Sequence, residues 1–214
     1  MTAERLPAVD FTLRRSARAR RSRITISDEG EVVVVLPMRA PAREAAELVA
    51  RHRSWIARHV TRMVARRRAL ALRPSLANGR VLTIDGVPQI VRAATAPERG
   101  ALERRLRRAA RAAILERVAA RSAEMGVSPG SVTIRDQRTR WGSASRSGTL
   151  SFNWRLILAP PEVLEYVVVH ELAHLRWAGH GKRFWSLVAR HFPGAAQARK
   201  WLRDNHDELR HALD

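Results

Sequence analysis

A nearly continuous apolar segment in the C-terminal part of the chain constrains the fold more than any other feature. Residues 161–175 read PEVLEYVVVHELAHL, and valine, leucine and alanine occupy most of these positions. At helical spacing the apolar side chains lie on all sides, and a helix that is apolar all round must be buried in a protein core. The segment is shorter than the ~18 residues that a membrane span requires, so we expect a core helix in a globular domain.

The motif HExxH lies inside this apolar helix, formed by His170, Glu171 and His174. The two histidines are one helical turn apart, ~6 Å along the axis, on one face of the helix. Their ring nitrogens can bind one metal ion at ~2.0–2.1 Å, and Glu171 beside them can accept a proton from metal-bound water. Burying these groups without partners is costly, and a metal removes that cost. The alternative is that His170 and His174 are core histidines whose ring nitrogens are satisfied by hydrogen bonds.

A third ligand for this site is expected from His180, six residues after His174. If the helix continued, His180 would be carried away from the metal face, so it can bind the metal only if the chain turns back. Gly179 and Gly181 flank it and favour such a turn, which would also return Trp185 to the site helix. Three histidines and an open position are typical of a catalytic zinc site. The competing third ligands are the downstream residues His191 and Glu208.

The remaining pattern alternates strands and helices. Asp28-Glu29-Gly30 separates two predicted strands as a hairpin turn, and Asp85-Gly86 marks a second hairpin. Apolar residues at helical spacing predict two long helices, over residues 42–68 and 101–124. The predicted strands span 23–27, 31–36, 81–84, 89–91, 131–135 and 149–154, and the predicted helices span 42–68, 101–124 and the segment that begins at Pro160-Pro161.

The basic composition leaves two interpretations open. Lysine and arginine number 40 against 20 acidic residues, a formal net charge of +20, and only Lys182 and Lys200 are lysines. A basic surface attracts nucleic acid by neutralising phosphates. A coding bias toward arginine and alanine produces the same composition without a selected partner, and we recognise no DNA-binding module.

Two arginine-rich segments are candidates for a binding surface. Residues 1–22 form either a basic arm or the edge of a first strand. In the helix predicted over 101–124, one side is apolar and the opposite side carries an arginine stripe, which is either a solvated face or a binding face. The apolar side comprises Leu102, Leu106, Ala110 and Ala113, and the stripe comprises Arg104, Arg105, Arg107, Arg108 and Arg111.

Cysteine is absent, which excludes disulfides, thiolate nucleophiles and cysteine-ligated metal sites. The first residues, MTAERLPAVDF, lack the apolar region of a secretory signal. We therefore expect a cytoplasmic protein without membrane association.

Two segments of the chain strongly resemble the YgjP-like metallopeptidase family, a relative of the SprT-like and Wss1-like proteases in the zincin group. They are NWRLILAPPEVLEYVVVHELAHLRWAGHGKRFW at residues 153–185 and RWGSAS at residues 140–145. The resemblance is strongest over 138–205 and extends more loosely to the N-terminal hairpin and the helix that contains Trp55 and Ile56. It implies an α+β fold with a zincin-like core, in which a small twisted sheet packs on a backing helix and on the HExxH active-site helix.

The resemblance also implies a domain organisation. Residues 1–22 are set aside as the basic arm, and the family domain is expected over 23–209. Within it, an N-terminal subdomain of β-hairpin and helix is expected at about 23–98, and the zincin catalytic core at about 99–206.

The family's functional residues carry over position by position. The resemblance implies that His170, His174 and His180 are the Zn²⁺ ligands and that Glu171 is the general base. Family members commonly carry cysteine after RWGS, whereas this chain has Ala144, which excludes a catalytic cysteine in that motif. Whether the residues from Arg140 to Ser143 shape the cleft or only turn the chain between strands is left open.

The implied activity is that of a zinc metallopeptidase, which cleaves peptide or protein substrates with zinc-activated water and a glutamate base. The strand at 150–154 is expected to pair with an extended peptide. Candidates for substrate binding, including stabilisation of the oxyanion, are Arg140, Asn153, Arg155 and Tyr166.

Two other functions use the same residues. One is a metal-dependent nucleotide or phosphoester hydrolase, which the basic surface favours. Against it, the chain has no glycine-rich phosphate loop and no carboxylate cluster for Mg²⁺. The other is a nucleic-acid-associated protease of the SprT-like type, which the arginine-rich segments favour.

Overall fold

The computed structural model describes residues 9–27 and 30–214, and the chain folds into two compact units that divide between Arg73 and Pro74. This division lies well before the boundary near residue 98 that the sequence suggested. The second hairpin explains the difference, because Leu82, Ile84 and Val91 are buried in the same core as the C-terminal helices. We call residues up to Arg73 unit 1 and residues from Pro74 unit 2.

Unit 1 contains a three-stranded sheet in the order β1-β3-β2. The strands are β1 (Thr12–Ser16), β2 (Arg23–Ile26) and β3 (Val32–Pro37), where β2 is antiparallel and β1 is parallel to β3. The predicted first hairpin is therefore confirmed, although residues 28 and 29 of its turn lie outside the described residues. Part of the expected basic arm is sheet, because β1 occupies residues 12–16.

Two helices cover one face of this sheet, α1 (Arg43–Arg51) and α2 (Arg53–Ala71). The sequence predicted one helix over 42–68, but the backbone leaves the helical region at His52, with φ −104° and ψ 13°. The break lets both helices reach the same sheet. The buried core of unit 1 consists of Val32, Val34, Leu36, Ala45, Val49 and Ile56.

Unit 2 begins with the hairpin β4 (Arg80–Ile84) and β5 (Val87–Val91), followed by the long helix α3 (Ala96–Met125). The α3 helix starts at a capping box between Thr95 and Glu98 and ends at Gly126, which adopts a left-handed φ of 62°. Its predicted apolar side is confirmed as buried. In the arginine stripe, Arg107 is half-buried beside Glu103 and Asp136, and the other four arginines are exposed.

A second three-stranded sheet in unit 2 has the order β6-β8-β7. Its strands are β6 (Ser131–Arg135), β7 (Gly142–Ala144) and β8 (Thr149–Asn153), with β8 parallel to β6 and antiparallel to β7. The expectation that residues 150–154 pair with a peptide is wrong, because β8 is the central strand and both of its edges are occupied. The edge strand beside the HExxH helix is β7, which the sequence did not predict.

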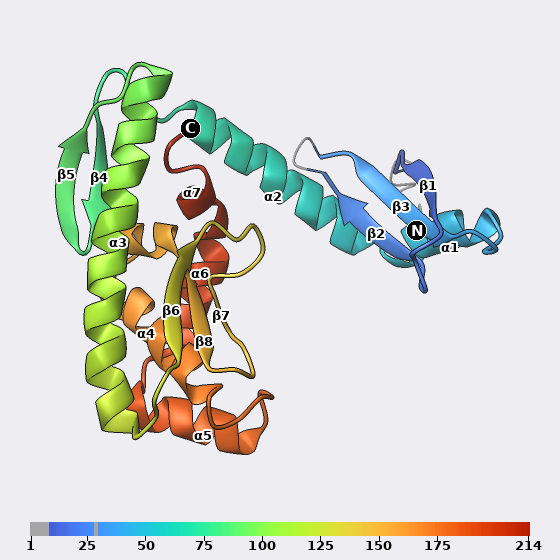
Figure 1. Ribbon diagram of the computed structural model, residues 1–214. Helices are drawn as coiled ribbons and strands as arrows, with labels where there is room; N and C mark the ends of the chain where they lie inside the picture. The colour runs from blue at the N-terminus through green and yellow to red at the C-terminus, as the bar shows by residue number, and fades with distance from the viewer. Residues whose placement is uncertain (1–8, 28–29) are drawn as a thin grey trace, which may run out of the picture. The chain divides into compact units, whose positions relative to one another are not determined.

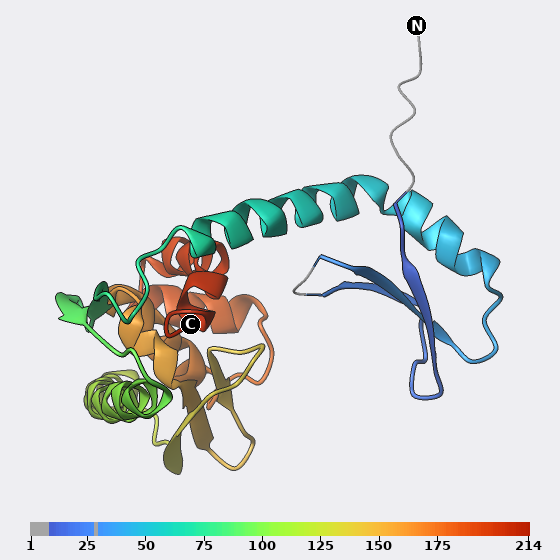
Figure 2. The same ribbon diagram turned by 90° about the horizontal axis from the view of Figure 1, so that it is seen from above.

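The apolar segment forms α4 (Pro161–Ala173), which follows the short 3-10 helix η1 (Trp154–Leu158). As expected, α4 is a core helix: its apolar side chains from Val163 to Ala173 are all buried. Helices α5 (Lys182–His191), α6 (Ala195–Asp204) and α7 (His206–Arg210) complete the unit. Figures 1 and 2 show α3 along the unit, with α4 and the sheet to one side of it.

Among the described residues, no helix combines the length and the hydropathy that a membrane crossing needs.

Candidate metal centre

Three histidines converge where α4 ends. One ring nitrogen from each of His170, His174 and His180 lies within 4.8 Å of the other two, and the Nε2 atoms of His170 and His180 are 3.1 Å apart. All three imidazole rings contact the aromatic ring of Phe184, which is fully buried in the first turn of α5. Phe184 thus forms an apolar floor under the cluster. The predicted grouping of these three residues is present in the structure.

The opposite nitrogens of two rings are held by partners outside the cluster. His174 Nδ1 lies 3.0 Å from the carbonyl oxygen of Trp177, and His170 Nδ1 lies 3.3 Å from the hydroxyl of Tyr166. A carbonyl can only accept, so His174 Nδ1–H is the donor and its Nε2 is left with a free lone pair. Hydrogen bonds of this kind fix the tautomer and the ring orientation of metal-binding histidines.

The chain reversal that delivers His180 occurs between α4 and α5. It brings the Trp185 ring to 5.8 Å from the His170 ring and to 5.6 Å from the His180 ring, between centroids, which confirms the predicted return of Trp185. The flanking glycines are not its cause. Neither Gly179 nor Gly181 adopts a positive φ, and a β-carbon on either would meet no atom within 4 Å.

Burial favours the neutral form of two of these histidines, His170 and His174. Burial, then the neighbouring positive charge of His174 and His180, lowers the pKa of His170 to about 3. Burial also lowers the pKa of His174, although the carbonyl of Trp177 opposes the effect. Both imidazoles are therefore unprotonated at neutral pH, which is the form that binds a metal.

The donor set fits a divalent transition metal. Imidazole ligands suit such ions, and tetrahedral bonds of ~2.0–2.1 Å place neighbouring nitrogens about 3.3 Å apart, close to the 3.1 Å separation of His170 and His180. The two Nδ1 contacts leave the Nε2 atoms of His170 and His174 available on the cluster side. The residues present are thus suited to the metal that a metallopeptidase requires.

Glu171 lies next to the cluster on α4 and is only 5% exposed. Burial raises the pKa of its carboxyl group to about 8, an effect that the positive charge of Arg140 partly offsets. The side chain packs directly on the backbone of β7 at Gly142. A β-carbon at Gly142 would lie 2.5 Å from Glu171 Oε1 and 2.7 Å from its Cγ, so only glycine leaves room for this side chain.

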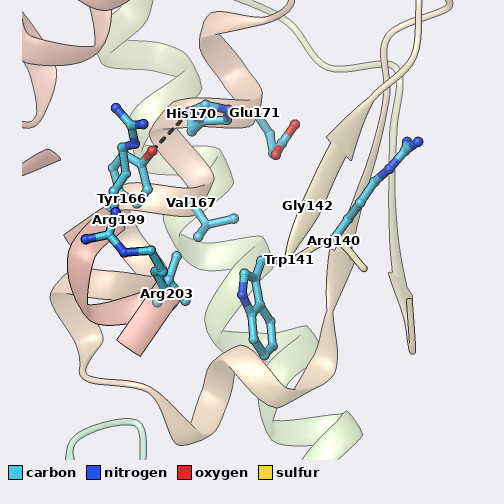
Figure 3. Close-up of a pocket in the computed structure, with 10 residues that line it drawn as sticks. Arg140, Trp141, Gly142, Tyr166, Val167, His170, Glu171, Arg199 and Arg203 are labelled. Atoms are coloured by element: carbon cyan, nitrogen blue, oxygen red, sulfur yellow. Dashed lines mark hydrogen bonds between the residues drawn. The ribbon is translucent and has the colours of Figure 1, made fainter. Parts of the chain in front are cut away.

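A cavity of about 370 Å³ opens beside Glu171 and His170 (Figure 3). Its walls come from α4, α6 and the segment that leads into β7. In Figure 3, Tyr166, Arg199 and Arg203 lie on one side of the cavity, and Arg140 and Trp141 lie on the other. The full lining is Arg140, Trp141, Gly142, Tyr166, Val167, His170, Glu171, Arg199, Leu202 and Arg203.

The structure brings two of the four predicted substrate-binding residues to this cavity, Arg140 and Tyr166. Asn153 is fully buried elsewhere, where its Oδ1 accepts from the backbone N–H of Arg155 and its Nδ2 donates to the carbonyl of Gln137. Arg155 forms an ion pair with Asp136 and stacks over the Trp154 ring. Asn153 and Arg155 therefore hold the loop before β7 rather than line the cavity.

Sequence reasoning missed Arg199 and Arg203 and the packing role of Gly142. The chain has many arginines, and the sequence does not distinguish these two from the others. Only the fold shows that α6 brings them to the cavity beside His170. The sequence did contain a signal for Gly142, because a glycine often marks a point where another group packs closely on the backbone. The sequence did not indicate that this group is the Glu171 side chain.

Comparisons with known proteins bear on this site. No curated protein matches the chain. Two solved structures are similar to a little under half of the chain. The metallopeptidase zymogen of Pyrococcus abyssi abylysin has 24% identity and a TM-score of 0.40, and the match covers 45% of this chain and 95% of that one. The zymogen of Methanocaldococcus jannaschii jannalysin has 19% identity and a TM-score of 0.36, and covers 47% of this chain and 97% of its own.

A family model gives the broadest match. The model described as YgjP-like, metallopeptidase domain, matches residues 20–205, which includes every residue of the cavity and of the histidine cluster. The chain therefore belongs to the YgjP-like metallopeptidase family, as its sequence predicted.

Proposed function

We propose that this metallopeptidase is a zinc-dependent enzyme of the zincin type, with His170, His174 and His180 as the zinc ligands and Glu171 as the general base. One observation carries the proposal: the buried carboxyl group of Glu171 adjoins a cluster of three histidines, and Glu171 and His170 line the same cavity. Zinc held by these residues would act as a Lewis acid and activate water near neutral pH. The same arrangement makes α3 the backing helix and α4 the active-site helix of the core.

Glu171 supplies the proton transfer in this proposal. The buried carboxyl group of Glu171 lies beside the histidine cluster, where its carboxylate form can take a proton from water and return it to a leaving amine. Its position depends on Gly142, because the side chain lies flat against the β7 backbone. Proton transfer by a placed side chain typically contributes ~10²–10⁴-fold to a rate.

The peptide is expected to lie along β7. This strand is the edge of its sheet, since β8 pairs with it on one side only, and its first residue, Gly142, lines the cavity. An edge strand can pair with an extended peptide by strand addition. A peptide added there would place a backbone carbonyl near Glu171 and the histidines.

Tyr166 is assigned a positioning role. Its hydroxyl contacts His170 Nδ1, its ring packs on Phe192, and burial raises its pKa to about 12, so it stays protonated at neutral pH. If Nε2 of His170 held a metal, its Nδ1–H would donate a hydrogen bond to the tyrosine oxygen.

A second candidate is a metal-dependent phosphoester hydrolase, and a specific observation favours it. Three arginines, Arg140, Arg199 and Arg203, line the cavity, and arginine is suited to binding phosphate. A nucleic-acid-associated protease rests on the exposed arginines of α3 and on the arginines of the N-terminal segment.

The deciding experiment is to incubate the zinc-loaded protein with a peptide library and with a nucleotide panel. We expect cleavage of peptides only, and loss of most of it in Glu171→Gln, which excludes contaminating hydrolases. Release of phosphate from nucleotides, abolished by the same substitution and without peptide cleavage, would replace the peptidase with the phosphoester hydrolase.

A further inference from the structure

The charge around the cavity is strongly one-sided. Three of its lining residues are arginines, and the acidic group among them is Glu171, which the proposed reaction uses as the base. Arg199 and Arg203 lie one turn apart on α6 and both face the cavity, with the buried Leu202 beside Arg203. Like charges at this spacing destabilise a helix slightly, so their placement has a small cost in the absence of an anion.

Contacts hold Arg199 beside the histidines. Its guanidinium carbon lies 4.6 Å from the centroid of the Trp185 ring, and that ring contacts both His170 and His180. Stacking on an aromatic face orients the planar guanidinium and leaves its N–H edge available to an acceptor.

Arg203 is only loosely engaged by protein. Its Nε lies 3.6 Å from Asp204 Oδ1, whereas the other oxygen of Asp204 is 2.6 Å from the Lys200 amino group. The acidic neighbour is therefore bound mainly to Lys200, on the part of α6 that does not line the cavity. Arg203 is 70% exposed and its pairing with Asp204 is long, so its guanidinium is accessible to a ligand at the cavity edge.

We infer that Arg199 and Arg203 form an anion subsite that binds a carboxylate side chain of the peptide, close to the bond that is cleaved. The inference rests on the proposed peptidase function and adds a substrate class to it. The cavity suits an acidic side chain, because the apolar surfaces of Val167, Leu202 and Trp141 can cover its methylene groups while the arginines bind its charge. The enzyme would thus prefer peptides that contain Glu or Asp beside the cleavage site.

The test compares peptides that differ by Glu or Gln at single positions around the cleavage site. A charge-assisted hydrogen bond of ~1.5–3 kcal/mol predicts at least a roughly tenfold higher kcat/KM for the Glu member at one position. The preference should fall to about twofold or less in Arg199→Gln and in Arg203→Gln, and Arg199→Glu should favour Lys at the same position. Arg190→Gln is the matched control: it removes an exposed arginine on α5 that does not line the cavity, and it should leave the preference unchanged.

A binding measurement separates this inference from the proposed function. Zinc-loaded Glu171→Gln should bind the Glu peptide roughly tenfold more tightly than the Gln peptide, measured by fluorescence anisotropy, and Arg199→Gln added to it should remove the difference. Tighter binding of the acidic peptide without any cleavage by the wild type would support the subsite and overturn the peptidase. Equal binding of both peptides, or a preference that persists in both arginine variants, would overturn the subsite.

Discussion

The carboxylate of Glu171 lies so close to the backbone of Gly142 that a β-carbon there would sit 2.5 Å from Oε1. The two residues come from different elements, α4 and the edge strand β7, and glycine is the residue that lets them meet. The RWGS segment thus has a packing role in this chain: it provides the surface on which the proposed base rests.

The first prediction follows from this contact. In Gly142→Ala, the Glu171 side chain must move, because its Cγ and Oε1 would both overlap the added carbon and the residue is buried. We expect peptide hydrolysis to fall by ~10²-fold or more, since a displaced base no longer reaches its proton. Zinc content should remain at the wild-type level, because the three atoms nearest to the added carbon all belong to Glu171 and none to a histidine. Full activity in this variant would show that Glu171 is not held by the contact.

The second prediction concerns metal content. We expect about one zinc per chain, measured by atomic emission after removal of loosely bound metal, because the three histidines form a single cluster. His170→Ala and His174→Ala should each abolish retention. His180→Ala should weaken the affinity for zinc. The far-UV circular dichroism of the protein should stay unchanged, since His180 lies outside α4 and its loss leaves that helix intact. His191→Ala is the control for the competing third ligand, and its retention of zinc should equal that of the wild type.

The third prediction tests the partner of His170. Tyr166→Phe removes the hydroxyl that lies 3.3 Å from His170 Nδ1 but keeps the ring that packs on Phe192. Loss of such an orienting partner typically costs ~10–100-fold in metal affinity. Competition with a chromogenic chelator measures this affinity, and the thermal stability of the metal-free protein serves as the control, which we expect to be nearly unchanged. An unaltered affinity would mean that the hydroxyl does not orient the ring.

The fourth prediction is a pH dependence of stability in the metal-free protein. The folded-state pKa of Glu171 is raised to about 8 from an ordinary value of 4.5, so between these values the native state holds a proton that the unfolded state lacks. The free energy of unfolding must therefore decrease as the pH rises through this window. Urea unfolding at about pH 5 and about pH 8 should show a larger decrease for the wild type than for Glu171→Gln. Parallel profiles for the two proteins would contradict the assignment.

A good part of the site was predictable because it is local in sequence. His170, Glu171 and His174 lie within one helix, and the apolar positions around them allowed no other element. His180 could be proposed because a turn of a few residues suffices to return it, although the turn does not need its glycines. Local spacing, turn chemistry and burial were enough for these residues.

The remaining parts of the site depend on long-range packing. Arg199 and Arg203 reach the cavity because α6 packs against α4, and nothing in their own segment distinguishes them from the other arginines. Similarly, β7 is only three residues long, and a strand of that length carries too little alternation to be recognised. The division of the chain at Arg73 was missed because the second hairpin is buried against η1 and α3, a contact that no local pattern indicates.

The separation of the proposed ligands from the surface that holds the proposed base has a practical consequence for handling this protein. The three histidines come from the short stretch between His170 and His180, whereas Glu171 rests on the strand β7, which is distant from it in the sequence. A preparation in which the sheet has loosened could therefore carry its full complement of zinc and yet be inert. Metal content alone is a poor measure of correctly folded material here, and active-site titration is the assay that reports it.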